Sequence, residues 1–236
     1  MELKGKVALV TGAAKGVGEA TAELLAKEGA DVGLLDINND AVENTASRIS
    51  RHQGAKALAL QGDVSIKSQV ERAVNTLQQQ FGRMDVLVNN AGIWKCGTLS
   101  EVSEEDWNLV LDVNLKGLLF CTQAVIPQMK QQQCGKIINI ASAVAFGPAP
   151  EWSAYCISKA AVAMLTQVAA KELEPFSIQV NALCPGAIDT DLTKQITQET
   201  GDEFPHAMPP EKVAEAVLRL VCPFEGTITG ELVTEI

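Results

Sequence analysis

Histidine is scarce in this chain, and its cysteines form no metal-binding pattern. Only His52 and His206 occur among the 236 residues, and the six cysteines never fall into a C-x-x-C spacing. Zinc sites draw on cysteine and histidine at short, characteristic spacings, so we expect no metal site. Several of the cysteines lie in apolar stretches, where a free thiol behaves as a small hydrophobic side chain.

The chain also lacks an excess of positive charge and any long apolar run. The formal net charge is −10, and a protein that binds nucleic acid needs a basic footprint, so we expect no nucleic-acid partner. No uninterrupted apolar run approaches the roughly 20 residues that span a bilayer. The first residues lead directly into a strand-like segment rather than into a secretory signal. We therefore expect a cytoplasmic protein that does not enter a membrane, with residues 1–236 forming one domain.

A glycine-rich turn lies between a strand-like and a helical segment near the start of the chain. Residues 6–11 are an apolar run typical of a buried parallel strand, and residues 19–28 favour a helix. Gly12 permits a tight turn, while Gly16 and Gly18 remove Cβ atoms that would block a pyrophosphate and the packing of the helix. The turn predicts a dinucleotide site, although three ordinary turn glycines would look the same.

The second predicted strand, residues 30–36, ends in an acid. A carboxylate at Asp36 would accept hydrogen bonds from the hydroxyls of an adenosine ribose and would repel a 2′-phosphate, and Ile37 follows rather than an arginine. We therefore expect NAD, with NADP less favoured. Lys15 is a weaker signal in the other direction because it could reach a 2′-phosphate. Asp36 could alternatively cap the helix predicted around residues 41–49.

Strand-like and helical segments alternate along the whole chain. Further helices are expected at residues 65–80 and 106–129, and further strands at residues 55–60, 84–89, 136–141, 177–183 and 227–233. This alternation predicts an α/β fold of Rossmann type: one doubly wound parallel sheet with helices on both faces and right-handed crossovers. Ligands of such sheets bind at the carboxyl ends of the strands.

Tyr155, the only tyrosine, lies four residues before Lys159 in a stretch that favours a helix. Residues four apart share one face of a helix, so the phenol and the ammonium should lie side by side. A neighbouring cation favours phenolate and lowers the pKa of the tyrosine, which would make the pair a general acid/base. An ordinary helix with one tyrosine and one lysine would show the same two letters.

Taken in order, these motifs resemble the short-chain dehydrogenase/reductase family over nearly the whole chain. Residues 11–18 look like its cofactor loop, residues 89–92 like its sheet-supporting motif, and residues 185–190 like its nicotinamide-side loop. The residues that look like its catalytic tetrad are Asn114, Ser142, Tyr155 and Lys159. The resemblance implies NAD(P)-dependent oxidation of an alcohol or reduction of a ketone, by a homodimer or homotetramer.

The resemblance also implies a role for each matching residue. Tyr155 would exchange a proton with the substrate oxygen, and Ser142 would hold that oxygen. Lys159 would lower the pKa of Tyr155 and bind the nicotinamide ribose, and Asn114 would help to place a water beside Lys159. Ser142 could instead cap the following turn, and Asn114 could bond its local backbone. The residues expected to bind the cofactor are Gly12, Lys15, Gly16, Val17, Gly18, Asp36, Ile37, Asp63, Val64, Asn90, Ala91, Gly92, Tyr155, Lys159, Pro185, Gly186, Ile188 and Thr190.

The substrate is less sharply specified. By analogy with the family, the residues near the reacting carbon would be Ser142, Val144, Trp94, Trp152, Ala187 and Leu192. They are mostly apolar, which suits a secondary alcohol or ketone with apolar groups better than a polyol. Residues 190–209, the usual lid segment, are fewer here than in many relatives.

Two alternatives stay open: an NADPH-dependent 3-oxoacyl-carrier-protein reductase-like enzyme, and a non-catalytic NAD(P)-binding sensor or scaffold. Asp36 argues against the NADPH-dependent reductase, and the complete tetrad argues against the non-catalytic sensor or scaffold.

Overall fold

The structure is a computed structural model that describes residues 2–53, 55–222 and 228–234, without the side chains of residues 52 and 53. Within these residues the strands form one sheet in the order β3-β2-β1-β4-β5-β6-β7, and every neighbouring pair is parallel. The strands are β1 (Val7–Thr11), β2 (Asp31–Asp36), β3 (Ala57–Gln61), β4 (Val86–Asn89), β5 (Gly135–Ile140), β6 (Ile178–Leu183) and β7 (Leu232–Val233). The doubly wound parallel sheet expected from the sequence is confirmed.

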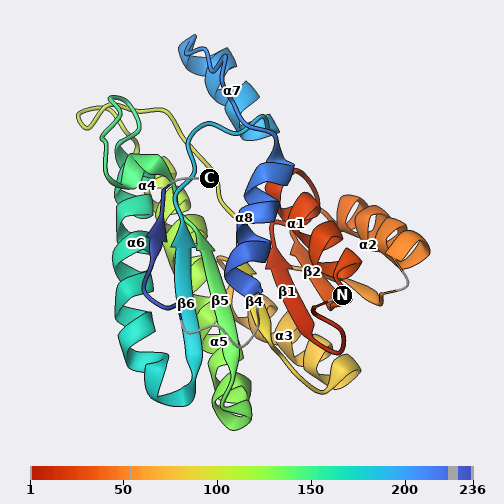
Figure 1. Cartoon of the computed structure of the whole chain (residues 1–236). Helices are drawn as coiled ribbons and strands as arrows, with labels where there is room; N and C mark the ends of the chain where they lie inside the picture. Colours follow the sequence, from red (N-terminus) through yellow and green to blue (C-terminus); the bar gives the residue numbers. More distant parts are fainter. Residues whose placement is uncertain (1, 54, 223–227, 235–236) are drawn as a thin grey trace.

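Helices cover both faces of this sheet (Figure 1). One face carries α1 (Gly16–Lys27), α2 (Asn39–Gln53) and α8 (Pro210–Val221), and the other carries α3 (Lys67–Phe81), α4 (Glu104–Leu111), α5 (Leu118–Gln132) and α6 (Ser153–Leu173). Helix α7 (Asp191–Thr200) lies beyond the carboxyl ends of the strands. The direction of the winding reverses between β1 and β4, and open α/β sheets bind their ligands at such a switch point.

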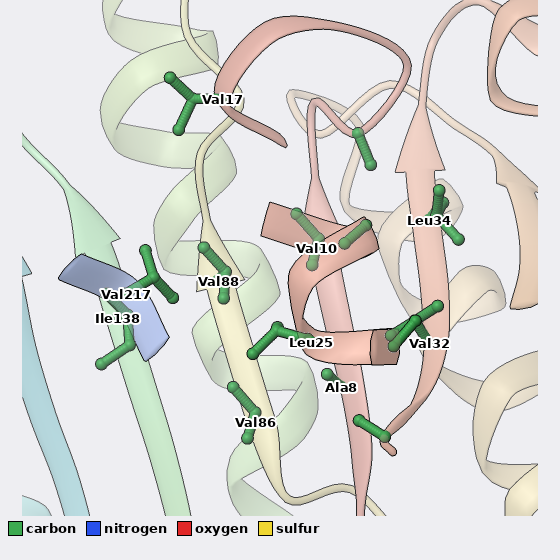
Figure 2. Close-up of a cluster of buried hydrophobic side chains, with 14 of the residues drawn as sticks. Ala8, Val10, Val17, Leu25, Val32, Leu34, Val86, Val88, Ile138 and Val217 are labelled. Carbon is green, nitrogen blue, oxygen red and sulfur yellow. The ribbon is translucent and has the colours of Figure 1, made fainter. Parts of the chain in front are cut away.

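Two apolar layers hold the helices on the sheet. In the first, Val10 and Val88 of the central strands meet Leu25 of α1 and Val217 of α8 (Figure 2). In the second, residues one position along the same strands, such as Leu9 and Leu87, face α3 and α5. Successive residues of a strand point to opposite faces, and a sheet covered on both faces therefore needs strands that are apolar throughout. The runs at residues 6–11 and 84–89 meet this requirement.

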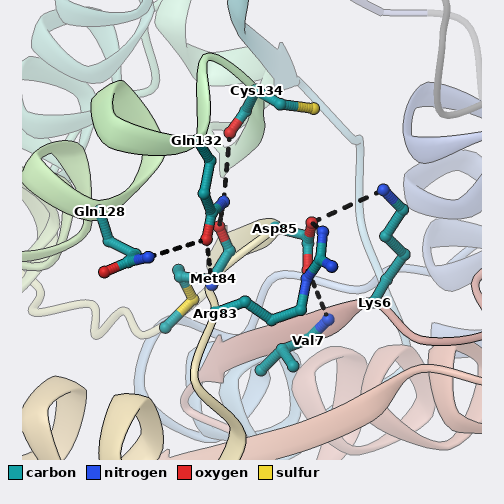
Figure 3. A network of polar contacts seen from close by, with 8 residues as sticks. All are labelled: Lys6, Val7, Arg83, Met84, Asp85, Gln128, Gln132 and Cys134. Atoms are coloured by element: carbon teal, nitrogen blue, oxygen red, sulfur yellow. Dashed lines mark hydrogen bonds and ion pairs between the residues drawn. The ribbon is translucent and has the colours of Figure 1, made fainter.

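A buried carboxylate, that of Asp85, lies at the amino ends of the strands, at the opposite end of the sheet from the switch point. Asp85 is 0% exposed, and it accepts hydrogen bonds from Val7 N at 2.9 Å and from Arg83 Nε and Nη2 at 2.6 Å each (Figure 3). The Lys6 ammonium lies 3.7 Å away. A buried charge is tolerated only with such partners, so Asp85 joins β1 to the start of β4.

The helix expected over residues 106–129 is divided in the structure. Helices α4 and α5 are separated by a π-helical turn, η1 (Asp112–Gly117). The stretch Glu104–Gln132 is long and apolar enough to cross a membrane by length and composition alone. Buried residues of α5, among them Cys121, Val125 and Met129, pack against the sheet instead, as in a core helix.

Three further differences concern the ends of elements and two missed helices. Helix α8 was not expected, although Val213, Val217 and Val221 recur at the helical spacing and are buried. The strand expected over residues 227–233 is reduced to β7, and residue 227 lies outside the described residues. The segment 190–209, the usual lid segment, contains helix α7, for which no helix was expected either.

Candidate active site

A cavity of about 1310 Å³ opens at the carboxyl ends of the strands, at the switch point between β1 and β4. Of the residues expected to bind the cofactor, all except Gly18 line it. Of those expected near the substrate, Trp94 alone does not. Of the expected tetrad, Ser142, Tyr155 and Lys159 line the cavity and Asn114 does not. One continuous space therefore joins the glycine turn to the tyrosine–lysine pair.

Glycine is required in the turn between β1 and α1 by the close approach of two backbones. Gly12 has a φ of +62°, and a Cβ built on it would lie 2.9 Å from Ala91 Cα. A Cβ on Gly18 would lie 2.6 Å from Asn90 Nδ2 and closer still to the Gly12 carbonyl oxygen. Gly18 thus acts through packing, which explains its place outside the cavity lining. The first turn of α1 has no side-chain cap, so its N–H groups are available to an anion.

Asn90 fastens the glycine turn to the end of β4. Its Nδ2 donates to the carbonyl oxygens of Thr11 at 3.0 Å and Gly12 at 3.1 Å. The Thr11 hydroxyl in turn accepts from the N–H groups of Asn90 and Ala91, both at 3.0 Å. These bonds fix the turn before any ligand is present, which lowers the ordering cost of binding.

The buried side chain of Asn89 points beneath the site and ties four elements together. Its amide donates to Thr122 of α5 at 3.1 Å and to Asn139 of β5 at 2.9 Å. Asn139 then donates to Thr166 of α6 at 2.9 Å. This chain of buried hydrogen bonds positions α6, the helix that carries Tyr155 and Lys159, against the sheet.

Acidic residues stand at the ends of β2 and β3. One carboxylate oxygen of Asp36 accepts from Ala14 N at 3.0 Å and the other accepts from Asn38 N at 2.9 Å. Asn38 rather than Asp36 caps α2, since its side chain accepts from Ala41 N at 3.1 Å. Ile37 is exposed beside it. Asp36 therefore holds the glycine loop and faces the cavity, and the alternative of a helix cap is not supported.

The acid after β3 closes a turn of its own. Asp63 accepts from the Ser65 N–H at 2.8 Å and from the Ser65 hydroxyl at 2.7 Å. Val64 is buried and packs closely on Gly117, where a Cβ would meet its side chain at 2.7 Å. Both residues line the cavity next to Asp36. This group of residues forms the wall of the cavity farthest along the sheet from the tyrosine–lysine pair.

The tyrosine–lysine pair sits at the other end, on the first turns of α6. Tyr155 is 8% exposed and Lys159 is 5% exposed. Lys159 Nζ donates to the Ile140 carbonyl oxygen at 2.8 Å and lies 5.5 Å from the centroid of the Tyr155 ring. Ser142, at the end of β5, lies near enough to Tyr155 to lower the pKa of the phenol, and its hydroxyl accepts weakly from Val144 N at 3.4 Å. Ser142 thus caps the following turn, as one of the two roles considered for it requires.

Burial dominates the protonation of this pair. Loss of solvent raises the pKa of Tyr155 to about 12, and the neighbouring Ser142 side chain only partly opposes that rise. Burial also lowers the pKa of Lys159 to about 8. In the protein by itself the pKa of the phenol is therefore raised rather than lowered as expected, because burial is the largest influence on it. Lys159, in contrast, can gain or lose a proton near neutral pH.

Asn114 sits in the π-helical turn and faces the loop after β4. Its Oδ1 accepts from Ile93 N at 2.8 Å, and its Nδ2 donates to the Ile93 carbonyl oxygen at 2.9 Å and to the Ser158 hydroxyl at 3.1 Å. It therefore bonds a backbone distant in sequence rather than its local one. A Cβ on Gly92 would lie 3.5 Å from both Asn114 Oδ1 and Lys159 Nζ, so the Asn114 amide and the lysine ammonium both lie next to Gly92.

The loop after β6 covers the face of the cavity opposite the tyrosine. Its expected residues all line the cavity: Pro185, Gly186, Ala187, Ile188 and Thr190. The Pro185 carbonyl oxygen accepts from Ala143 N at 2.8 Å, which joins this loop to the turn after Ser142. At the other end, a Cβ on Gly16 would lie 3.3 Å from Thr190 Cγ2. The loop thus bridges the two ends of the cavity.

The substrate side is apolar and partly aromatic. Trp152 lies edge-on to both Tyr155 and Trp94, with ring centroids 5.9 Å and 5.6 Å away. Trp94 is 1% exposed and stands behind Trp152, so it supports the wall rather than lining it. Phe204 lines the cavity 6.5 Å from Trp152, and Ile196 of α7 lines it too.

Ile196 and Phe204 were missed from the sequence. Ile196 follows Leu192 at the helical spacing of four, a signal that could have placed it, whereas Phe204 lies in a loop after Gly201 that has no periodicity. The short segment nevertheless closes the substrate side with these two residues and Leu192.

The strand–glycine turn–helix unit, the switch-point cavity and the tyrosine–lysine pair define a dinucleotide-binding oxidoreductase fold, and known proteins agree. Residues 6–201 match the family model of the short chain dehydrogenases. A 3-oxoacyl-acyl-carrier-protein reductase of Thermotoga maritima is 39% identical over 99% of this chain and 97% of that protein. An NAD-dependent glycerol dehydrogenase of Listeria innocua is 38% identical over 96% of this chain and 90% of that protein. An NAD⁺-bound xylitol dehydrogenase structure matches with a TM-score of 0.93 at 30% identity, over 99% and 98% of the two chains.

The chain therefore belongs to the short-chain dehydrogenase/reductase family. It is an oxidoreductase that acts on CH–OH or carbonyl groups, with a fold that binds a nicotinamide cofactor. The residues present fit such a cofactor, because the glycine turn leaves a cradle at an uncapped helix N-terminus and the cavity continues to Tyr155. A non-catalytic sensor or scaffold is not supported by these relatives, whose names are those of reductases and dehydrogenases.

Proposed function

We propose that this protein transfers a hydride between NAD(H) and a secondary alcohol or ketone, with Tyr155 as the general acid/base. The observation that carries the proposal is the position of the Tyr155 phenol. Its ring lies edge-on to Trp152 with Ser142 close by, at the apolar end of a cavity that begins at the glycine turn. A bound nicotinamide would supply the hydride chemistry. The remaining roles belong to side chains of this chain.

Ser142 and Tyr155 would hold the substrate oxygen between them. Since the pKa of Tyr155 is raised, the phenol is protonated at neutral pH and is ready to donate a proton to a ketone oxygen. Lys159 would carry the proton onward, because its pKa of about 8 allows both protonation states near neutral pH. Asn114 would keep the Gly92–Ile93 backbone in place beside the lysine.

The preference for NAD rests on Asp36. Its carboxylate is anchored to the Ala14 N–H at the mouth of the glycine loop, where it would accept from ribose hydroxyls and repel a 2′-phosphate. The NAD-dependent glycerol dehydrogenase and the NAD⁺-bound xylitol dehydrogenase add support by name. A polyol substrate is less favoured, since the substrate side is built from apolar and aromatic side chains.

A second candidate is a 3-oxoacyl-carrier-protein reductase-like activity that uses NADPH. It is favoured by the 39% identity with the Thermotoga maritima enzyme over nearly its whole length. The net charge of −10 speaks against it, because an acidic carrier would be repelled. Titration of the protein with NADH and NADPH, followed by nicotinamide fluorescence, separates the two candidates.

A homodimer or homotetramer is also proposed, with residues 1–236 as one domain. Helices α4 and α6 expose the apolar side chains Leu109, Ile157, Met164 and Val168 on the surface of the monomer. Clusters of this kind often mark a protein–protein contact. Sedimentation at several concentrations tests the oligomer.

We further propose a cytoplasmic location without membrane insertion, which accords with the free thiols of all six cysteines in the described residues.

Tyr155→Phe tests the central proposal. We expect turnover of an accepted ketone to fall by at least about 100-fold, while NADH affinity measured by fluorescence stays unchanged. Ser142→Ala, which removes only the second hydroxyl, should lower turnover in the same direction. Near wild-type turnover of Tyr155→Phe with intact NADH binding would show that another group supplies the proton.

A further inference from the structure

A salt bridge crosses the mouth of the cavity between the glycine turn and α7. Lys15 Nζ lies 2.7 Å from Asp191 Oδ2. Lys15 belongs to the β1–α1 turn, and Asp191 is the first residue of α7. Beside this pair, a Cβ built on Gly16 would lie 3.3 Å from Thr190 Cγ2. Neither partner is needed for the stability of the core, since both side chains are exposed, at 71% and 63%.

Lys15 also stands next to the position that distinguishes the two nicotinamide cofactors. The preceding residue, Ala14, donates its N–H to the carboxylate of Asp36 at 3.0 Å. A 2′-phosphate on the ribose would have to lie beside this carboxylate, with Lys15 within one residue of it. The ammonium of Lys15 is, however, paired with Asp191, and the described structure shows no salt bridge between Lys15 and Asp36.

We propose that Asp191 is a specificity residue for the cofactor: by pairing with Lys15, it withholds that ammonium from the 2′-phosphate of NADP(H). This inference rests on the proposed function. Two carboxylates would then disfavour NADPH in different ways. Asp36 repels the phosphate directly, whereas Asp191 competes with it for a cation. Arg48, another cation that lines the cavity, is similarly held by Glu19 and Glu23.

The charges around Asp191 support this assignment. Its pKa is lowered by the hydrogen bond and the charge of Lys15, and to a lesser extent by the charge of Lys194, so it is ionised at neutral pH. Lys194 itself pairs with Asp189 at 3.5 Å. Asp189 is 64% exposed, carries the same charge two residues earlier, and makes no salt bridge with Lys15 in the described structure. It is therefore a matched control for the loss of one negative charge from this segment.

The experiment is a fluorescence titration with NADH and with NADPH of the wild type, Asp191→Asn, Asp189→Asn and the double variant Asp191→Asn/Lys15→Gln. Exposed ion pairs are weak, so we expect Asp191→Asn to improve NADPH affinity about threefold to fivefold relative to NADH. Asp189→Asn should leave the ratio of the two affinities unchanged. The double variant should lose the gain, because the freed ammonium is no longer there.

Each other outcome has a definite meaning. An unchanged ratio in Asp191→Asn, or the same change in both affinities, overturns the inference, since the salt bridge would then only fasten α7 to the glycine turn. An equal gain in Asp189→Asn also overturns it, since general charge would explain the effect. If the wild type bound neither dinucleotide, the proposed function would fail first, and this outcome is distinct from the others.

Discussion

Lys159 donates to the Ile140 carbonyl oxygen at 2.8 Å, while its nitrogen stays 5.5 Å from the ring centroid of Tyr155. The lysine is thus held by the sheet and not by the phenol. In this position the ammonium is largely buried, and burial lowers its pKa to about 8. The arrangement has a consequence for stability that can be measured without substrate or cofactor.

Lys159 should make the stability of the protein rise with pH. Because its pKa falls from 10.5 to about 8 on folding, the unfolded chain binds a proton between these pH values that the folded chain lacks. The free energy of unfolding therefore rises between about pH 8 and pH 10.5. Below this range the burial of the charged lysine destabilises the folded state by a constant amount of about 3 kcal/mol. Urea unfolding of wild type and Lys159→Met should show the free-energy difference shifting toward the wild type from about pH 8 upward. Tyr155 is present in both proteins, so its own titration drops out of the difference between the two free energies of unfolding. Parallel pH profiles would contradict the lowered pKa.

Asp85→Ala should destabilise the protein without touching the active site. The substitution leaves Val7 N and the Arg83 guanidinium without their buried acceptor, and removing one partner from a buried ion pair costs about 3 kcal/mol. Glu71→Gln, which breaks an exposed pair with Lys67, should change stability by less than about 0.5 kcal/mol. Chemical denaturation measures both. Equal effects of the two substitutions would mean that the Asp85 network contributes no more than a surface pair.

Gly18→Ala should impair dinucleotide binding through the backbone. The added methyl group would meet the Gly12 carbonyl oxygen and the Asn90 amide, so the glycine turn must move, at a cost of about 1–3 kcal/mol. We expect NADH affinity to fall at least about tenfold, with lower thermal stability. Gly147→Ala is the control, because nothing lies within 4 Å of a Cβ there. Wild-type NADH affinity in Gly18→Ala would show that the turn tolerates the shift.

Phe204→Ala should widen the range of substrates that the enzyme accepts. Phe204 forms the outer wall of the substrate side, facing Trp152, and its removal opens space beside the phenol of Tyr155. In a series of ketones of increasing size, kcat/KM should fall for the smallest and rise for the largest. Phe146→Ala, which truncates an exposed aromatic outside the cavity lining, should leave the profile unchanged. An unaltered profile in Phe204→Ala would place substrate selection elsewhere.

Local signals in the sequence were enough for the sheet, the glycine turn and the position of the tyrosine–lysine pair. Runs such as residues 6–11 are apolar throughout because both faces of the sheet are covered, and the turn glycines are demanded by backbones in contact. The pKa of Tyr155 could not be predicted, because spacing reports the nearby cation and not the loss of water. For a similar reason Trp94, which was expected in the lining, stands behind Trp152, and Phe204, which was not expected, lines the cavity. Which aromatic residue lines a wall depends on loops whose course no periodicity records.

The π-helical turn at Asp112–Gly117 changes what a single long helix can do. A π turn accommodates one residue more than the α-helical pattern, and one residue corresponds to a rotation of about 100° around the axis. Helix α4 can therefore face α6, while α5 faces α3 and the sheet, within one continuous stretch. Loss of any one residue from this turn would leave a regular helix with its second half in the wrong phase. Length in this stretch should consequently be more restricted than the identity of its exposed side chains.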